Sequence, residues 1–297
     1  MIEVNGLTKA FGNLKAVDNL SVAFEPGVTG LVGHNGAGKS TLLRCIAGVF
    51  EPNGGEAKVN GNLSNTKQAK TDLFFLPDDP FAPMGANIKE TFNFYSGLFE
   101  FDKEKFNSLV KTFGLPNNKA VRTFSKGMKR QLFVALALSA KADNLLLDEA
   151  FDGLDPMVVD VIKGEILECA SQNKTIVVSS PNILALERLA DRFVVLNKGQ
   201  VAKQGSQEDI GVEFVKYQAA FKFKANEQNI ADLGYEVVSF RSVGSVSHFV
   251  IYETPGALEH IKEKLDPLFI EQVPFEPDEV LTLEMMAAKK KEGGENA

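Results

Sequence analysis

A glycine-rich segment near the N-terminus limits which folds this chain can adopt. The segment reads Gly33-His34-Asn35-Gly36-Ala37-Gly38-Lys39-Ser40-Thr41 and matches the phosphate-binding pattern G-x-x-x-x-G-K-[ST] without a gap. Its glycines let the backbone turn tightly and direct N–H groups at phosphate oxygens. Lys39 can reach the β- and γ-phosphates as a flexible positive charge, and Ser40 can offer its hydroxyl to Mg²⁺. The segment therefore predicts a site for a phosphorylated ligand.

The flanking sequence favours a phosphate site over a chance glycine-rich turn. Residues 29–32 before the segment are typical of a buried strand, and residues 41–47 after it are typical of a helix. A phosphate held between them would lie at a helix N-terminus, where free N–H groups and the helix dipole stabilise an anion. We therefore expect the chain to bind a nucleoside triphosphate.

Composition limits the other classes of function. The chain has 297 residues, enough for one large domain and a small one, and its net charge of −7 argues against nucleic acid as the main partner. Cys45 and Cys169 are its only cysteines, too few for a disulfide framework or a zinc site. No segment has the length and apolarity to span a bilayer, and the N-terminus does not resemble a signal peptide, so we expect a cytoplasmic protein.

Alternating strands and helices predict an α/β domain over residues 1–217. Short runs typical of strands lie at 2–4, 20–24, 58–61, 71–76, 145–147, 175–178 and 192–196. Residues 87–115 follow a helical, aromatic-rich pattern, and another helix is expected to begin near Ser125. We expect a mostly parallel sheet covered by helices on both faces, with a helical subdomain at about 85–140.

The pattern changes after residue 217 and predicts a small C-terminal domain at 218–287. Strands are expected at 220–224, 236–241, 247–252 and 268–273, with helices at 226–233 and 255–265. This β-α-β-β-α-β order is that of the ferredoxin-like α+β arrangement. A last helix from Asp278 would lead into a disordered polar tail at 288–297. We favour a dimerisation or stabilising role for this domain over a regulatory ligand site, because no polar cluster in it stands out.

Two carboxylates at the end of an apolar strand supply the second half of the predicted site. Asp148 and Glu149 directly follow the run Asn144-Leu145-Leu146-Leu147, and the period of a strand points them to opposite sides. We assign Asp148 to Mg²⁺ and Glu149 to the general base that polarises the attacking water. A pair of solvated loop acids is the alternative, and an apolar strand is a poor place for such a pair.

Further motifs carry a resemblance to a known family. The segment Phe124-Ser125-Lys126-Gly127-Met128-Lys129-Arg130-Gln131 precedes the acidic strand, and Gly153-Leu154-Asp155-Pro156 follows it. Together with the phosphate loop, these segments resemble the signature sequence, second nucleotide motif and D-loop of the ATP-binding-cassette (ABC) ATPases. The resemblance covers about residues 1–210 and extends to the ATP-binding subunits of bacterial exporters, whose membrane subunit is a separate chain.

The resemblance implies a mechanism with ATP and Mg²⁺ as ligands. Phe11 would stack on adenine, and Asp155 would belong to the D-loop. Two cassettes would sandwich two ATP molecules head to tail, with Ser125, Lys126 and Gly127 of one facing the γ-phosphate bound by the other. ATP binding would close this dimer and hydrolysis would open it. The motion would pass through residues around 78–87 to a membrane permease, which would hold the chain peripherally at the inner face of the cell membrane.

Two positions depart from the family's pattern. Asp78 stands where the family has a glutamine that reaches Mg²⁺ and the attacking water, and Pro181 stands where it has a histidine that contacts the γ-phosphate. Proline has neither a side-chain donor nor a backbone N–H. Asp78 remains a candidate metal ligand, although it places another negative charge near the γ-phosphate. We therefore expect firm MgATP binding, slow hydrolysis, and a homodimer or an asymmetric heterodimer.

Two other kinds of ABC ATPase are alternatives to an exporter subunit. A soluble ATPase of translation or DNA repair is disfavoured by the single phosphate loop, by the acidity of the chain, and by the short distance along the chain from Ser40 to Asp148. A soluble nucleotide-sensing regulatory ATPase without a transport role remains open, because a proline replaces the histidine.

Overall fold

The computed structural model describes residues 1–181, 183–186, 188–206, 214–252 and 254–273. The chain divides into two compact units, Met1–Ile210 and Gly211–Ala297. The boundary between the units lies after Ile210, earlier in the chain than the boundary expected at residue 217. Residue 217 lies inside strand β11 (Phe214–Ala220). Among the described residues, no helix is long and apolar enough to cross a membrane.

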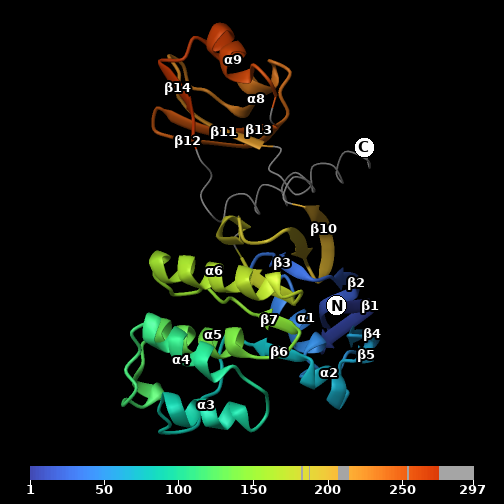
Figure 1. The fold of residues 1–297 in the computed structure, drawn as a ribbon. Coiled ribbons are helices and arrows are strands. Elements are labelled where there is room, and N and C mark those ends of the chain that lie inside the picture. Colours follow the sequence, from blue (N-terminus) through green and yellow to red (C-terminus); the bar gives the residue numbers. More distant parts are fainter. Residues whose placement is uncertain (182, 187, 207–213, 253, 274–297) are drawn as a thin grey trace. The chain divides into compact units, whose positions relative to one another are not determined.

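A six-stranded, mostly parallel sheet forms the centre of the first unit, which confirms the expected α/β class (Figure 1). Its order is β10-β9-β3-β8-β7-β6, and only the edge strand β10 runs antiparallel to its neighbour. Strands β7 and β8 are buried along their whole length, because their apolar runs are covered on both faces of the sheet. The strand bounds are β3 (Gly27–Val32), β6 (Leu73–Leu76), β7 (Asn144–Leu147), β8 (Thr175–Ser180), β9 (Arg192–Asn197) and β10 (Gln200–Ser206).

A second, antiparallel sheet lies beside the first and shares its core. Its order is β2-β1-β4-β5, from β2 (Leu14–Phe24), β1 (Ile2–Phe11), β4 (Gly54–Val59) and β5 (Asn62–Leu63). Helix α1 (Lys39–Ile46) contributes Leu42 and Leu43 to the cluster that joins Leu31 of the first sheet to Ile2 of the second. Helix α6 (Pro156–Ser171) packs against β3 and β8. The phosphate-loop helix is therefore anchored by an apolar core.

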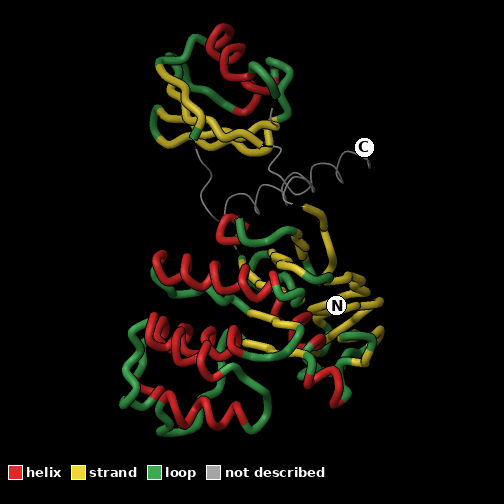
Figure 2. Tube along the Cα trace, in the orientation of Figure 1, coloured by secondary structure: helices red, strands yellow, loops and turns green. Residues whose placement is uncertain are grey.

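Figure 2 shows the helices of the region beside β6 in red, and aromatic side chains pack this region against that strand. It contains α3 (Ile88–Ser96), α4 (Lys103–Thr112) and α5 (Lys126–Ser139), with the short helix α2 (Lys67–Thr71) before β6. The expected helical stretch 87–115 is broken at 97–102, where Asp102 accepts hydrogen bonds from the Glu104 and Lys105 N–H groups and starts α4. Phe74 of β6 meets Phe99 and Phe101 edge-on, with ring centroids 5.0 and 5.8 Å apart.

The C-terminal unit has the expected ferredoxin-like order. Its antiparallel sheet, β12-β13-β11-β14, is joined by α8 (Glu227–Ala231) and α9 (Ala257–Leu265), and the other strands are β12 (Val237–Val243), β13 (Val246–Tyr252) and β14 (Phe269–Gln272). The first strand is an error of the sequence prediction, because β11 ends at Ala220 rather than starting there. Alternate residues Val215, Tyr217 and Ala219 pack into this unit's core and fix the strand. The helix expected from Asp278 and the tail at 288–297 lie outside the described residues.

Candidate functional site

The phosphate loop connects the end of β3 to the start of α1 in a conformation that requires glycine. Gly36 and Gly38 have φ values of 85° and 106°. A Cβ on Gly38 would lie 2.4 Å from the Ala16 carbonyl oxygen, and a Cβ on Gly33 would lie 2.7 Å from that of Leu196. Gly38 is also the N-cap of α1, so no side chain caps the helix within the described loop. The first N–H groups of α1 are therefore available to an anion.

Lys39 is buried within the loop that it follows. Its Nζ donates to the carbonyl oxygens of Gly33 (2.5 Å) and His34 (3.2 Å). Burial holds the pKa of Lys39 below its ordinary value. The negative charges of Glu149 and then Asp148 oppose this shift without cancelling it. The two carboxylates thus lie close enough to act electrostatically on the lysine, as expected if all three share one site.

A pocket of about 400 Å³ joins the phosphate loop to Phe11. Its lining includes Phe11, most of the loop from Asn35 to Thr41, and Glu149. The Phe11 ring is 47% exposed and meets the ring of Phe50 edge-on at 5.5 Å, with Lys9 Nζ 5.3 Å from the Phe11 centroid. An aromatic ring with a free surface beside a phosphate loop can stack on a planar base.

Asp148 is a fully buried acid whose two carboxylate oxygens differ in their hydrogen bonding. Its Oδ1 accepts a hydrogen bond from Ser179 Oγ at 2.6 Å, while Oδ2 is buried without a hydrogen-bond partner among the described residues. An unpartnered buried carboxylate oxygen is costly, and a hard cation with oxygen ligands would compensate it. These features fit the predicted Mg²⁺ role of Asp148 together with Ser40. No group of three or more His, Cys, Asp or Glu side chains is clustered for a metal in the described ranges.

Glu149 has a strained backbone that is held by a neighbouring strand. Its φ of 50° is in the left-handed region, which costs a non-glycine residue about 1–3 kcal/mol. Its N–H donates to Ser179 Oγ at 2.9 Å, so one hydroxyl contacts both acidic residues. Sequence reasoning missed Ser179, because its role depends on the pairing of β8 with β7, which places Val178 opposite Leu147.

The two departures from the family's pattern lie in loops at the same edge of the sheet. Asp78 Oδ1 is 2.9 Å from Arg44 NH2 of α1, so its carboxylate has a cationic partner. Pro181 directly follows β8, two residues after Ser179, and offers no donor to a phosphate. The metal role of Asp78 stays a prediction, and the oxygen that Arg44 binds is Oδ1.

The signature residues lie at the start of α5, next to the D-loop. Ser125 caps α5 by accepting a hydrogen bond from the Met128 N–H at 3.2 Å, and Lys126 Nζ is 2.5 Å from Asp152 Oδ2. A Cβ on Gly127 would lie 2.9 Å from the Gly153 carbonyl oxygen, so this glycine permits the close approach of the two segments. Asp155 caps α6 by accepting from the Met157 N–H at 2.9 Å. Their contact with a second subunit's ATP stays a prediction.

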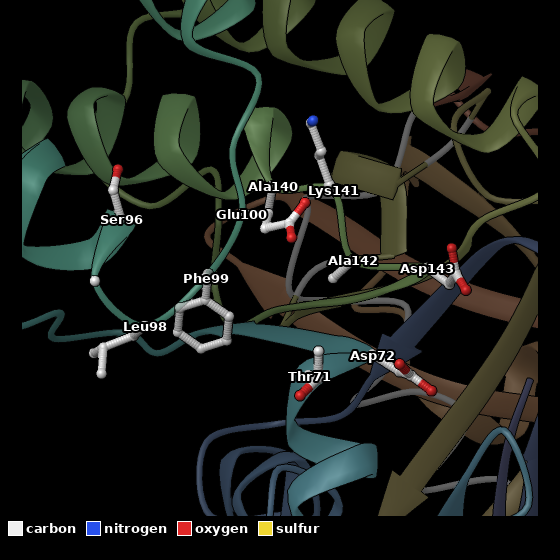
Figure 3. A pocket seen from close by; sticks show the side chains of 11 residues that line it. Thr71, Asp72, Ser96, Leu98, Phe99, Glu100, Ala140, Lys141, Ala142 and Asp143 are labelled. Carbon is white, nitrogen blue, oxygen red and sulfur yellow. The ribbon is translucent and has the colours of Figure 1, made fainter.

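Another pocket, of about 510 Å³, lies away from this site (Figure 3). It is lined by residues such as Asp72, Glu100 and Asp143, from segments next to the starts of β6 and β7 and the end of α3. Parallel strands start at one edge of a sheet and end at the other. Because the phosphate loop follows the end of β3, this pocket belongs to the opposite edge.

Comparisons with known proteins agree with this geometry. The family model described as ABC transporter matches residues 17–152, which contain the phosphate loop, the signature segment and both acids. An ABC transporter ATP-binding protein of Methanocaldococcus jannaschii is 32% identical over 216 residues, covering 70% of this chain and 79% of that protein. The ABC transporter ATP-binding protein YtrB of Bacillus subtilis is 27% identical over 284 residues, covering 91% of this chain and 97% of YtrB.

A solved structure shares the fold. The ATP-binding subunit of an ABC transporter matches this chain with a TM-score of 0.66 at 24% identity, covering 71% of this chain and 91% of the other. The predicted family and fold are therefore confirmed. The chain belongs to the family of ABC transporter ATP-binding proteins.

Proposed function

We propose that this chain is the ATP-hydrolysing subunit of an exporter whose membrane permease is a separate chain. The observation that carries the proposal is the shared pocket of the phosphate loop and Glu149, together with a buried Asp148 oxygen that lacks a hydrogen-bond partner in the part of the chain that the structure describes. This combination provides a phosphate cradle, a candidate cation ligand and a candidate base in one place.

The residues of the site have separate roles in this proposal. The loop's N–H groups and Lys39 bind the phosphates, and Phe11 orients the base. Asp148 and Ser40 would hold Mg²⁺, which neutralises charge on the β- and γ-phosphates when it is bound. Glu149 accepts the proton of the attacking water. Hydrolysis is slow because Pro181 supplies no donor to the γ-phosphate, and the Asp78 carboxylate is paired with Arg44.

A second cassette completes the site, and an exposed apolar surface serves the permease. The signature residues Ser125, Lys126 and Gly127 contact the nucleotide of the second cassette, in a homodimer or heterodimer. The segment after β6 exposes Phe81 (62%) and Met84 (97%), and Phe94 of α3 packs beside Phe81 with ring centroids 5.7 Å apart. Contiguous exposed apolar side chains of this kind mark interaction sites. The chain would thus lie in the cytoplasm, at the inner face of the membrane.

The decisive measurement is ATP turnover of the chain assembled with its cognate membrane subunit. We expect firm MgATP binding and a turnover well below the ~10 s⁻¹ typical of enzymes. Glu149→Gln should lower turnover about 10²–10⁴-fold, the usual contribution of a general base, and leave binding intact. Turnover near ~10 s⁻¹ would contradict slow hydrolysis, and failure to bind MgATP would overturn the whole proposal.

Pro181 favours one alternative, a soluble nucleotide-sensing regulatory ATPase without a transport role. In that case the chain would bind MgATP but would not assemble with a membrane protein. Purification of the tagged chain from detergent-solubilised membranes separates the two functions. Co-purification of a multi-span membrane protein supports the transporter, and its absence supports the regulatory ATPase.

A further inference from the structure

Arg130 is a buried cation whose side chain is bound by backbone carbonyl groups. It lies in the first turns of α5 and is 3% exposed. Its described partners are three carbonyl oxygens, and no carboxylate of the described residues pairs with it. A guanidinium is costly to bury, so a position that binds it through fixed carbonyl groups is specific for its forked geometry.

The three carbonyl groups come from two segments of the nucleotide site. Arg130 NH1 donates to the Pro77 oxygen at 3.1 Å, and NH2 donates to the Asp78 oxygen at 2.6 Å. NH1 also donates to the Asp148 oxygen at 3.2 Å. Arg130 therefore connects the loop after β6 to the end of β7.

The Asp148 carbonyl belongs to the peptide bond that joins Asp148 to Glu149. The N–H of the same peptide bond donates to Ser179 Oγ at 2.9 Å. Arg130 and Ser179 thus bind the two polar ends of a single peptide plane. The φ of Glu149 is 50°, a strained value that persists only where the surroundings enforce it.

We propose that Arg130 is a positioning residue for Glu149 and makes the placement of this base depend on the loop at Pro77 and Asp78. The inference rests on the proposed ATP hydrolysis, in which Glu149 is the base. Displacement of the loop would move the guanidinium, loosen the Asp148–Glu149 peptide and change the direction of the Glu149 carboxylate. The same loop leads into the exposed apolar segment around Phe81.

The kinetic test compares Arg130→Lys with Arg122→Lys, an exposed arginine shortly before the same helix. Lysine keeps the charge but cannot span three carbonyl groups. In Arg130→Lys we expect kcat to fall about a hundredfold, the loss that a displacement of about 1 Å of a catalytic group can cause. The Kd for MgATP should change by less than about twofold. Arg122→Lys should match the wild type. In a Glu149→Gln background, Arg130→Lys should cause no further loss of kcat, because both changes act through one base.

A second measurement does not depend on turnover. Amide hydrogen exchange at Glu149 should accelerate about tenfold in Arg130→Lys, with β13 of the C-terminal unit unchanged as an internal control. Ser179→Ala, which removes the other half of the clamp, should accelerate the same amide, and Ser179→Thr should restore its protection. Unchanged exchange at Glu149 in folded Arg130→Lys, or an equal fall in kcat from Arg130→Lys with and without Glu149, would overturn the inference. A wild type without turnover overturns the proposed hydrolysis instead, and the exchange experiment still decides the role of Arg130.

Discussion

Individual polar atoms determine what this nucleotide site can do. The Ser179 hydroxyl contacts both acids, and Lys39 is buried. One oxygen of Asp148 has no hydrogen-bond partner within the described ranges. Each of these features concerns one proton or one lone pair. The corresponding predictions therefore concern single substitutions and pH.

The buried ammonium of Lys39 predicts an alkaline loss of nucleotide affinity. Burial holds the pKa of Lys39 below the ordinary 10.5, so the folded protein releases this proton at a lower pH than the unfolded chain. Between the two pKa values the unfolded chain binds more protons, so stability rises with pH while the charge that binds phosphate is lost. MgATP affinity should fall through this alkaline range, as titration calorimetry would measure. Lys39→Arg, which stays charged, should not show this fall, and parallel curves for the two proteins would contradict the assignment.

The absence of a donor at Pro181 predicts that histidine at this position accelerates turnover. Pro181→His would place an imidazole donor after β8, at the edge of the sheet that carries Glu149. We expect kcat to rise roughly tenfold, less than the full effect of an evolved donor. Pro181→Ala is the control, because it removes the ring and restores the same backbone N–H as histidine would, but adds no side-chain donor. Equal rates for the two variants would mean that another group already contacts the γ-phosphate.

At the scale of elements, the packing of segments decides which residues meet. The signature helix α5 and the D-loop approach so closely that only glycine fits at position 127. The Arg44–Asp78 ion pair similarly joins α1 to the loop after β6. The motifs of the site therefore depend on one another through their backbones.

A matched pair of glycines tests this packing. Gly127→Ala brings a Cβ to 2.9 Å from the Gly153 carbonyl oxygen, whereas Gly164 of α6 has open space around it. We expect Gly127→Ala to destabilise the protein by about 1–3 kcal/mol through overpacking. Gly164→Ala should instead stabilise it by about 0.5–1 kcal/mol through helix propensity. Denaturant unfolding measures both, and equal effects would contradict the close contact.

Elements with a strong local pattern were predictable, and contacts between elements were not. The phosphate loop, the acids after β7 and the start of α5 at Ser125 follow from spacing and capping. Ser179 and Arg130 escaped prediction because their partners lie on other strands and loops. The first C-terminal strand was misplaced because Phe221 and Phe223 extend the apolar character of the segment beyond Ala220, where the strand ends.

At the scale of the whole molecule, two units have separate cores. The cluster around Leu31 and Leu42 is formed within the first unit, and the cluster around Phe249 and Ile251 is formed within the second. A compact unit with its own core can unfold independently of its neighbour. Nucleotide binding should therefore be insensitive to damage in the C-terminal unit.

This separation predicts the outcome of a cavity in the second core. Phe249 is fully buried, so Phe249→Ala should destabilise the C-terminal unit by about 3–5 kcal/mol. Calorimetry should show one transition lowered and the other unchanged, with MgATP affinity preserved. Phe223→Ala, at a 44% exposed position of the same unit, is the control. A parallel loss of nucleotide affinity in Phe249→Ala would show that the units are coupled.

The half-exposed ring of Phe11 has an optical consequence. The chain contains no tryptophan, so none of its intrinsic fluorescence comes from an indole. A single Phe11→Trp substitution would place the only indole of the chain on the wall of the nucleotide pocket. Its emission would then follow each arrival and departure of nucleotide in real time, without a label and without background from any other indole.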